Sequence, residues 1–278
     1  MLFRKFNYSL CSLLLPLLLL GSCKTKIDDP RMKVGDDTIF MEGFLNPVAD
    51  SITIGLSVAK GAVTSGNKIK EEELLQAEVS IESEGVVKRL SFSHWNNTVA
   101  VYVLSAEEMP VVAGNTYTVR VHREGVFSAF ASTTVPGGDF DFTFDVTGPV
   151  VNSNSGERTY KVSGYITDEK DAHNYYRLTS DDTARGYTYN ELLLADNPDV
   201  PGRISFRADV TEDMYEMGSG ILFITHITKD LYLYLTTIRN LEDNDGNPFA
   251  EPSTLYSNVQ GGLGILGGMN TKGRPVRP

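Results

Sequence analysis

The strictest alternation of apolar and polar residues in this chain is Asp139-Phe140-Asp141-Phe142-Thr143-Phe144-Asp145-Val146. Successive side chains of a β-strand point to opposite faces of the sheet, so a strand with one buried face reads with a period of two. Further strands are predicted on both sides of this stretch, at residues 51–58, 78–82, 117–122, 159–166, 175–179 and 203–210. The sequence therefore predicts a mainly β protein with half-buried strands.

Turn residues separate the predicted strands at short intervals, as at Asn46-Pro47 and Glu84-Gly85. Short strands at this spacing, with few helical stretches between them, are typical of antiparallel sandwiches. Pro136-Gly137-Gly138 has the composition of a hinge, and we place a domain boundary there. We therefore expect two antiparallel β-sandwich (Ig-like) domains, an N-terminal one over residues 37–136 and a mainly β C-terminal one over residues 139–278.

One stretch of the second half departs from the period of two. Its apolar residues recur every three or four positions, as on one face of a helix, at Leu231, Leu235, Ile238 and Leu241. Thr228 suits the N-cap, because its hydroxyl can accept a hydrogen bond from the first turn. We therefore predict one helix near the C-terminus, over residues 228–241; the alternative is a strand through Leu231, Leu233 and Leu235.

The first residues have the pattern of a bacterial lipoprotein signal peptide. Two cations precede a leucine-rich run that ends in Leu20-Gly21-Ser22-Cys23. The run is too short to span a bilayer as a stable helix, and a cysteine directly after Leu-Gly-Ser is the residue to be acylated. We expect residues 1–22 to be removed, Cys23 to carry lipid and residues 23–36 to form a tether. The alternative is an ordinary secretory signal that ends near a cysteine.

Charge and cysteine content narrow the classes of partner. Residues 1–22 contain two cations and no acid, so the mature chain would hold 23 basic and 36 acidic residues, a net charge of −13. Such a chain repels nucleic acid and anionic headgroups, so we expect no nucleic-acid partner and membrane attachment through the lipid alone. Because lipidation would consume the remaining cysteine, Cys23, we expect no disulfide and a fold stabilised by its core.

Several motifs together resemble an uncharacterised lipoprotein family of Bacteroidetes, over nearly all of the mature chain. They are Ala113-Gly114-Asn115-Thr116-Tyr117, His173-Asn174-Tyr175-Tyr176 and the C-terminal signature Ser257-Asn258-Val259-Gln260-Gly261-Gly262-Leu263-Gly264. The chain departs from that family at Leu266, where phenylalanine is usual. The resemblance implies a lipid-anchored outer-membrane protein of unassigned activity, often encoded near TonB-dependent receptors. It transfers no catalytic residue, and we expect the protein to be exposed on the cell surface.

The glycine-rich residues 262–267 formally fit a dinucleotide-binding fingerprint, but that motif needs a βαβ unit and a later acid, and the sequence offers neither. We instead expect a strand or loop that packs closely against the second sheet, with glycine where a side chain would clash. The histidines lack ligand spacing, and a calcium loop around Gly246 would put Leu241 where an acid is required. We therefore expect neither cofactor nor metal, although a loose ion site near Asp168 stays open.

The sequence also gives no assignment of catalytic residues. No Gly-x-Ser-x-Gly occurs, and paired carboxylates of a glycoside hydrolase meet only in the fold. We assign no catalytic residue. Exposed aromatic rings can stack on sugars or peptide side chains, although tyrosine is also common in strands for packing reasons. Tyr187 and Tyr189, in an expected loop beside Gly186, are the candidate ligand-binding pair, and Trp95 is either their counterpart in the first domain or a hairpin end packed on its sheet.

Three functions fit these observations, in this order. The first is a non-enzymatic, lipid-anchored accessory protein that binds a nutrient or docks on a TonB-dependent transporter. The second is a surface adhesion or structural module. The third is a lipid-anchored hydrolase, which would need convergent acids or a Ser/His pair in a cleft.

Overall fold

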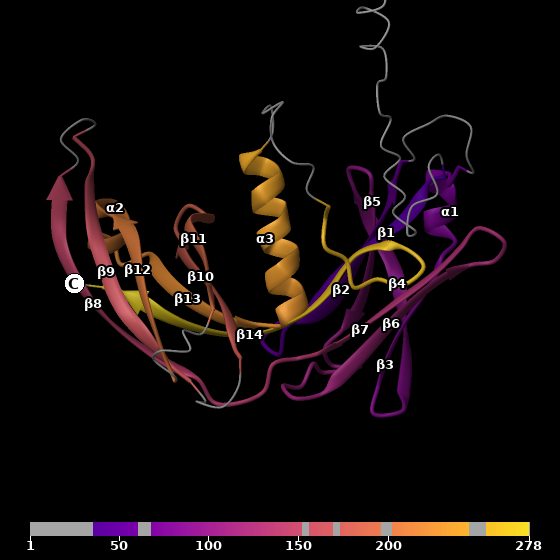
Figure 1. The fold of residues 1–278 in the computed structure, drawn as a ribbon, viewed down its shortest axis with the longest axis horizontal. Helices are drawn as coiled ribbons and strands as arrows, with labels where there is room; N and C mark the ends of the chain where they lie inside the picture. Colours follow the sequence, from indigo (N-terminus) through magenta and orange to yellow (C-terminus); the bar gives the residue numbers. More distant parts are fainter. Residues whose placement is uncertain are drawn as a thin grey trace, which may run out of the picture.

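The computed structural model describes residues 36–60, 68–151, 156–168, 173–195, 202–244 and 254–277, and is mainly β (Figure 1). The strands of the first half are β1 (Thr38–Leu45), β2 (Ser51–Ala59), β3 (Glu78–Ser83), β4 (Val86–Asn96), β5 (Val99–Ser105), β6 (Thr116–Arg123) and β7 (Phe127–Thr134). Those of the second half are β8 (Asp141–Val151), β9 (Arg158–Thr167), β10 (Tyr175–Asp182), β11 (Tyr187–Ala195), β12 (Arg203–Thr211), β13 (Gly220–Ile227) and β14 (Leu263–Val276). The helices are α1 (Glu71–Leu75), α2 (Glu212–Glu216) and α3 (Lys229–Asp243).

The strands form a large sheet and a smaller one. The large sheet has the order β11-β10-β13-β14-β1-β2-β5-β4-β3-β6-β7, and the smaller sheet has the order β12-β9-β8. The last strand, β14, joins the two halves of the large sheet. Its first six residues run parallel to β1, and Met269 to Val276 pair antiparallel with β13. In Figure 1 this yellow strand passes below α3 towards the C-terminus.

The predicted strands are confirmed, and the side chains of the clearest one take the expected faces. Phe140 and Phe142 are each 1% exposed, whereas Asp141 and Thr143 on the opposite face are exposed to solvent. Burial of each large apolar side chain favours folding by about 1.5–3 kcal/mol. The prediction of a mainly β fold is therefore correct. The number of sandwich domains and the boundary at residues 136–138 stay predictions.

Two main clusters of buried apolar residues lie in the two halves. The first draws on strands between Ile39 and Val135 and is completed by Val259 and Leu266. The second lies between the smaller sheet and the strands β10, β13 and β14, and ends with Val276. Residues from the C-terminal segment therefore contribute to both clusters.

The predicted helix is confirmed as α3, so the strand alternative is wrong. Thr228 is its N-cap, and the Thr228 hydroxyl accepts a hydrogen bond from the backbone N–H of Leu231 at 3.4 Å. The helices α1 and α2 were not predicted, because five residues are too few to show a helical period. Within the described part of the chain, no helix is both long and apolar enough to cross a membrane.

The helix α3 packs on the large sheet where the two halves meet. Leu231 and Tyr234 are buried against the sheet, beside Ile265 of β14. The Tyr234 hydroxyl donates a hydrogen bond to the Glu42 carboxylate of β1 at 3.1 Å. Near the other end of the helix, the Arg239 guanidinium lies 3.3 Å from the Glu191 carboxylate of β11. These contacts connect α3 to strands of both halves.

The glycine-rich segment forms a strand, as one of the two expectations had it, but its neighbour differs from the prediction. Residues 263–268 lie beside β1 of the first half rather than against the second sheet. A Cβ on Gly264 would lie 2.0 Å from the Met41 carbonyl oxygen, and one on Gly262 would lie 2.7 Å from that of Ile39. Glycine is therefore required there for close approach of two backbones. Sequence alone did not indicate which strand approaches.

Side chains close the smaller sheet onto the large one at both edges. The Ser180 hydroxyl donates to the carbonyl oxygen of Asp209 in β12 at 3.3 Å, and the Asn190 amide donates to the same oxygen. At the opposite edge, Lys272 of β14 donates to the carbonyl oxygen of Phe140, the residue before β8, and Arg274 of β14 donates to that of Phe142 in β8. Carbonyl groups at the strand edges are thereby satisfied by side chains instead of another strand.

Candidate functional site

The four residues singled out from the sequence do not form one site. Cys23 lies outside the described residues. Trp95 is on β4, and Tyr187 and Tyr189 are on β11, with six strands of the large sheet between β4 and β11. The aromatic candidates of the two halves therefore belong to separate surfaces.

Trp95 is half-buried and packs against the core of the first half. Its ring lies edge-on to Phe92, with the centroids 6.2 Å apart, and Phe92 also contacts Tyr102 at 5.9 Å. The ladder between β4 and β5 shifts register between Phe92 and His94, and this bulge lets Phe92 and Trp95 face the same way. Phe92 is 39% exposed. Packing on the sheet is therefore the role that the structure shows for Trp95.

Tyr187 and Tyr189 lie in strand β11, so the expectation of a loop is wrong at both positions. Tyr187 is 41% exposed. Tyr189 is half-buried against the second core, and its hydroxyl donates to the Glu157 carboxylate at 3.3 Å. Burial, followed by the nearby Glu157 charge, raises the pKa of the Tyr189 hydroxyl. Tyr187 therefore presents its ring to solvent, whereas Tyr189 serves mainly as packing.

A pocket of about 360 Å³ lies where the segment between the two halves meets the second half, and we call it the junction pocket. Its walls come from the end of β7 and the segment between β7 and β8, the residue after β9, the start of β10 with the two residues before it, the end of β13 and the turn into α3. The lining residues are Thr134, Pro136, Gly137, Gly138, Phe140, Asp168, His173, Asn174, Tyr175, His226, Ile227, Thr228 and Lys229. Its volume is within the usual range of small-molecule sites, about 300–1,000 Å³.

Three rings form an aromatic wall beside the junction pocket. His226 is stacked on Tyr176, its cross-strand partner, with ring centroids 4.8 Å apart. Phe140 lies edge-on to both rings, at 6.0 Å from His226 and 5.4 Å from Tyr176. The backbone carbonyl of Phe140 accepts a hydrogen bond from Lys272 at 2.6 Å. The ring positions are therefore fixed by packing and by the β14 edge contact.

The C-terminal signature lines another pocket of about 790 Å³, together with the start of β1 and the turn between β6 and β7. Its central residue, Asn258, has a structural role. The Asn258 amide donates to the carbonyl of Leu266 and accepts from the N–H of Leu266, each at 3.0 Å, so it pairs with β14 like a strand. It also donates to Asp230 at 3.3 Å. The signature thus connects β14 with the start of α3.

Tyr256 strengthens the same connection, because its hydroxyl donates to the Asp230 carboxylate. Burial and then the Asp230 carboxylate raise the pKa of Tyr256 to about 12. The family signature in the sequence contains Asn258, but it did not indicate what Asn258 contacts. The partners of Tyr256 and Asn258, namely Asp230 and Leu266, come into contact with them only in the folded chain.

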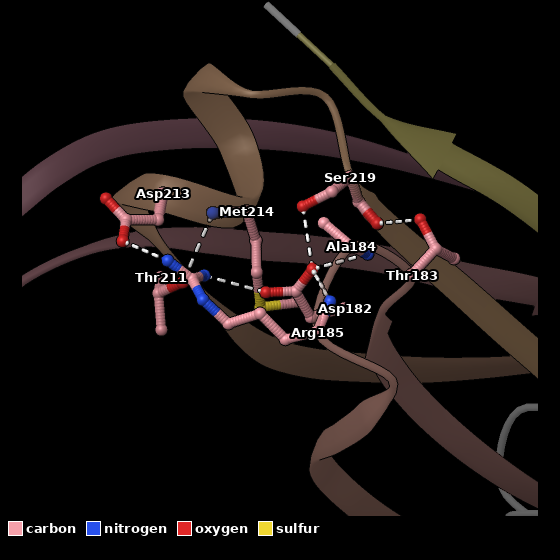
Figure 2. Close-up of polar contacts among 8 residues, drawn as sticks. All are labelled: Asp182, Thr183, Ala184, Arg185, Thr211, Asp213, Met214 and Ser219. Atoms are coloured by element: carbon pink, nitrogen blue, oxygen red, sulfur yellow. Dashed lines mark hydrogen bonds and ion pairs between the residues drawn. The ribbon is translucent and has the colours of Figure 1, made fainter.

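Sequence reasoning also missed a buried carboxylate at the far end of β10 (Figure 2). Asp182 is fully buried and accepts hydrogen bonds from the backbone N–H groups of Ala184 and Arg185 and from the Ser219 hydroxyl. The Arg185 guanidinium lies 2.8 Å from Asp182 and 2.6 Å from Asp213 of α2. Because its oxygens are occupied by fixed donors, Asp182 is suited to structure rather than to catalysis.

Possible metal ligands are scattered within the described part of the chain. There, no group of three or more His, Cys, Asp or Glu side chains is placed to hold a metal ion. His173 and His226 line the junction pocket. Gly246, around which a calcium loop was considered from the sequence, lies outside the described residues.

Comparison with known proteins gives a family but no activity. No curated protein matches the sequence. The crystal structure of dimeric latent PorU from Porphyromonas gingivalis aligns with 87% of this chain at 10% identity and a TM-score of 0.21, and the aligned part is 21% of the PorU chain. A family model described as a domain of unknown function, DUF4249, matches residues 25–274. This chain therefore belongs to the DUF4249 family.

Proposed function

We propose that the protein is a lipid-anchored accessory protein of a bacterial outer membrane, which binds a nutrient or docks on a TonB-dependent transporter without catalysing a reaction. The observation that carries this proposal is the junction pocket, whose lining combines aromatic rings with polar side chains. Such a mixture suits reversible binding of a small molecule, because apolar walls supply affinity and a few polar groups fix orientation.

The sequence supplies the cellular setting of the proposal. The Leu20-Gly21-Ser22-Cys23 segment and the resemblance to lipoproteins of Bacteroidetes support acylation of Cys23 and a place on the cell surface. We also propose that the two halves are Ig-like sandwich domains, over residues 37–136 and 139–278. The two separate apolar cores support that division.

Fractionation of cells tests the anchor directly. Cys23→Ser should move the protein from the membrane fraction to the soluble fraction, because it removes the thiol that would be acylated. A variant that stays with the membrane as firmly as the wild type would contradict lipid anchoring. Protease treatment of intact cells then tests surface exposure.

Co-purification tests the accessory role. The anchored protein should bring a TonB-dependent receptor with it from detergent-solubilised membranes, and its deletion should reduce uptake of the corresponding nutrient. Recovery of the protein without a receptor, combined with normal uptake by the deletion strain, would rule the role out.

An adhesion or structural module is the second candidate, and one observation favours it. The hairpin between β3 and β4 presents two neighbouring apolar side chains, Val86 and Val87, which are 51% and 59% exposed. Exposed apolar groups of this kind occur at protein contacts. Val86→Ser/Val87→Ser should then weaken attachment of cells to a protein matrix and leave nutrient uptake unchanged.

A further inference from the structure

Two polar residues of the junction pocket have their charge-bearing groups available for a ligand. Within the described residues, neither Lys229 nor His173 makes an ion pair or a side-chain hydrogen bond. Neighbouring cations of the fold are already engaged, since Lys272 lies 2.8 Å from Asp139 and Arg239 lies 3.3 Å from Glu191. Lys229 therefore contributes to the lining of a pocket a positive charge that is not held in an ion pair.

Two acids lie near Lys229, and neither forms an ion pair with it among the described residues. Asp230, the next residue along the chain, accepts hydrogen bonds from Tyr256 and from Asn258. Asp168 also lines the pocket, and it already has an interaction partner. In a chain with 36 acidic and 25 basic residues, a concave site that keeps an unpaired lysine favours a negatively charged ligand.

The remaining walls favour a ligand that also has an apolar part. Phe140, Tyr175 and Ile227 line the same pocket, and the His226 ring is held in place against Phe140 and Tyr176. A volume of about 360 Å³ admits a small molecule rather than a folded partner. One lysine together with one histidine suits a singly charged group better than a phosphate, which is usually bound by several donors.

We propose that the junction pocket binds a small carboxylate with an apolar substituent, such as an organic acid or the C-terminus of a short peptide. The Lys229 ammonium binds the carboxylate, His173 provides a second polar contact, and the rings and Ile227 contact the apolar substituent. This inference rests on the proposed role of the pocket as a binding site and specifies the chemical class of its ligand.

Binding of matched probes to the purified full-length chain tests the inference. The probes are short straight-chain acids and N-acetylated amino acids and dipeptides, each paired with its amide, together with inorganic phosphate. Isothermal titration calorimetry should detect binding of at least one free acid and of none of the corresponding amides. The two groups of acids distinguish a peptide C-terminus from an organic acid as the source of the carboxylate.

Two matched variants then test whether the Lys229 ammonium is the group that binds the carboxylate. Lys229→Gln should weaken binding of the acid about tenfold, equivalent to about 1.4 kcal/mol. Lys70→Gln, at an exposed lysine beside α1, should bind like the wild type. Circular dichroism should show that both variants are folded, because both side chains lie at the surface.

The inference is wrong if the amides bind as well as the acids, if phosphate binds more tightly than every acid, or if no acid binds. Wild-type affinity of Lys229→Gln would also overturn it. Because calorimetry uses the isolated chain, these outcomes are independent of the fractionation of Cys23→Ser. Failure of the ligand class is therefore distinguishable from failure of the lipid-anchored role.

Discussion

Asp182 illustrates how one buried carboxylate can hold several segments of a β protein together. Its donors come from the turn after β10 and from Ser219 before β13, while Arg185 extends the contact to α2. Burial alone would raise the pKa of Asp182, but the Ser219 hydroxyl, the Arg185 guanidinium and two backbone N–H groups outweigh burial and lower it. A carboxyl group whose pKa is lower in the folded chain stabilises the fold above its unfolded pKa, about 3.9.

We expect Asp182→Asn to destabilise the protein at neutral pH, because the new amide N–H₂ would face donors that need an acceptor. The control is Asp213→Asn, whose side chain is 64% exposed and should contribute little. Urea denaturation measures both. The wild-type advantage over Asp182→Asn should shrink as pH falls below about 4, because the carboxyl of the unfolded chain then binds a proton while the native carboxyl, with its lower pKa, still resists protonation. Equal losses in the two variants would contradict this role.

The orientation of single aromatic side chains could not be predicted from the sequence. Trp95 and Tyr189 were candidates because their rings could bind a ligand, but both rings pack against cores. Their orientation depends on register shifts between β4 and β5 and between β10 and β11. A bulge changes which face a side chain takes, and no composition or period in the sequence marks it.

Whole strands and α3 were easier to predict, because their apolar residues repeat with a regular period. The stretch Asp139 to Val146 and the helix over 228–241 both correspond to elements of the structure. The partner of β14 was not predictable in this way. Gly264, Gly267 and Gly268 have no side chains to show a period, and β1 lies more than 200 residues earlier. The junction pocket likewise depends on segments that meet only in the fold.

Gly264 tests the close approach of β14 to β1. It has φ = +116°, and a Cβ there would lie 2.0 Å from the Met41 carbonyl oxygen. Gly264→Ala should therefore lower the free energy of unfolding by more than about 3 kcal/mol, through backbone strain and overpacking. Urea denaturation measures the loss.

Gly125→Ala is the matched control for that experiment. Gly125 has φ = +71°, but no atom lies within 4 Å of the added Cβ. The expected loss is about 1–2 kcal/mol, from backbone strain alone. Similar losses at the two positions would show that β14 tolerates a side chain against β1.

The start of α3 should depend on its cap. Thr228→Ala removes the acceptor for the Leu231 N–H and should cost about 1 kcal/mol of stability. Thr228→Ser keeps an oxygen at that place and should cost much less. Thermal unfolding followed by circular dichroism compares the two. If serine is as damaging as alanine, the methyl group of Thr228 rather than its hydroxyl matters.

The two halves of the molecule share a strand, and this has consequences for how the chain unfolds. Neither half can lose β14 without exposing an edge in the other, since residues 263–268 pair with β1 and residues 269–276 pair with β13. The contacts of α3 with Glu42 and Glu191 add to the connection. A hinge composition at residues 136–138 does not by itself make the halves independent.

We therefore expect the two halves to unfold in a single cooperative transition. The sole tryptophan of the chain, Trp95, reports on the first half by fluorescence, whereas ten of the thirteen tyrosines follow residue 138 and report mainly on the second half by near-ultraviolet circular dichroism. The two signals should change at the same urea concentration. Two separated midpoints would show that the halves unfold independently.

The pairing of β1 with β14 also bears on the order of events during synthesis. The ribosome makes the first strand of the large sheet early, but its parallel neighbour comes only from residues 263–268. Until then one flank of β1 has no strand to bond to, and closing so long a loop is entropically slow. A nascent or truncated chain would thus expose an unpaired strand edge, to which chaperones or other incomplete copies of the chain can bind.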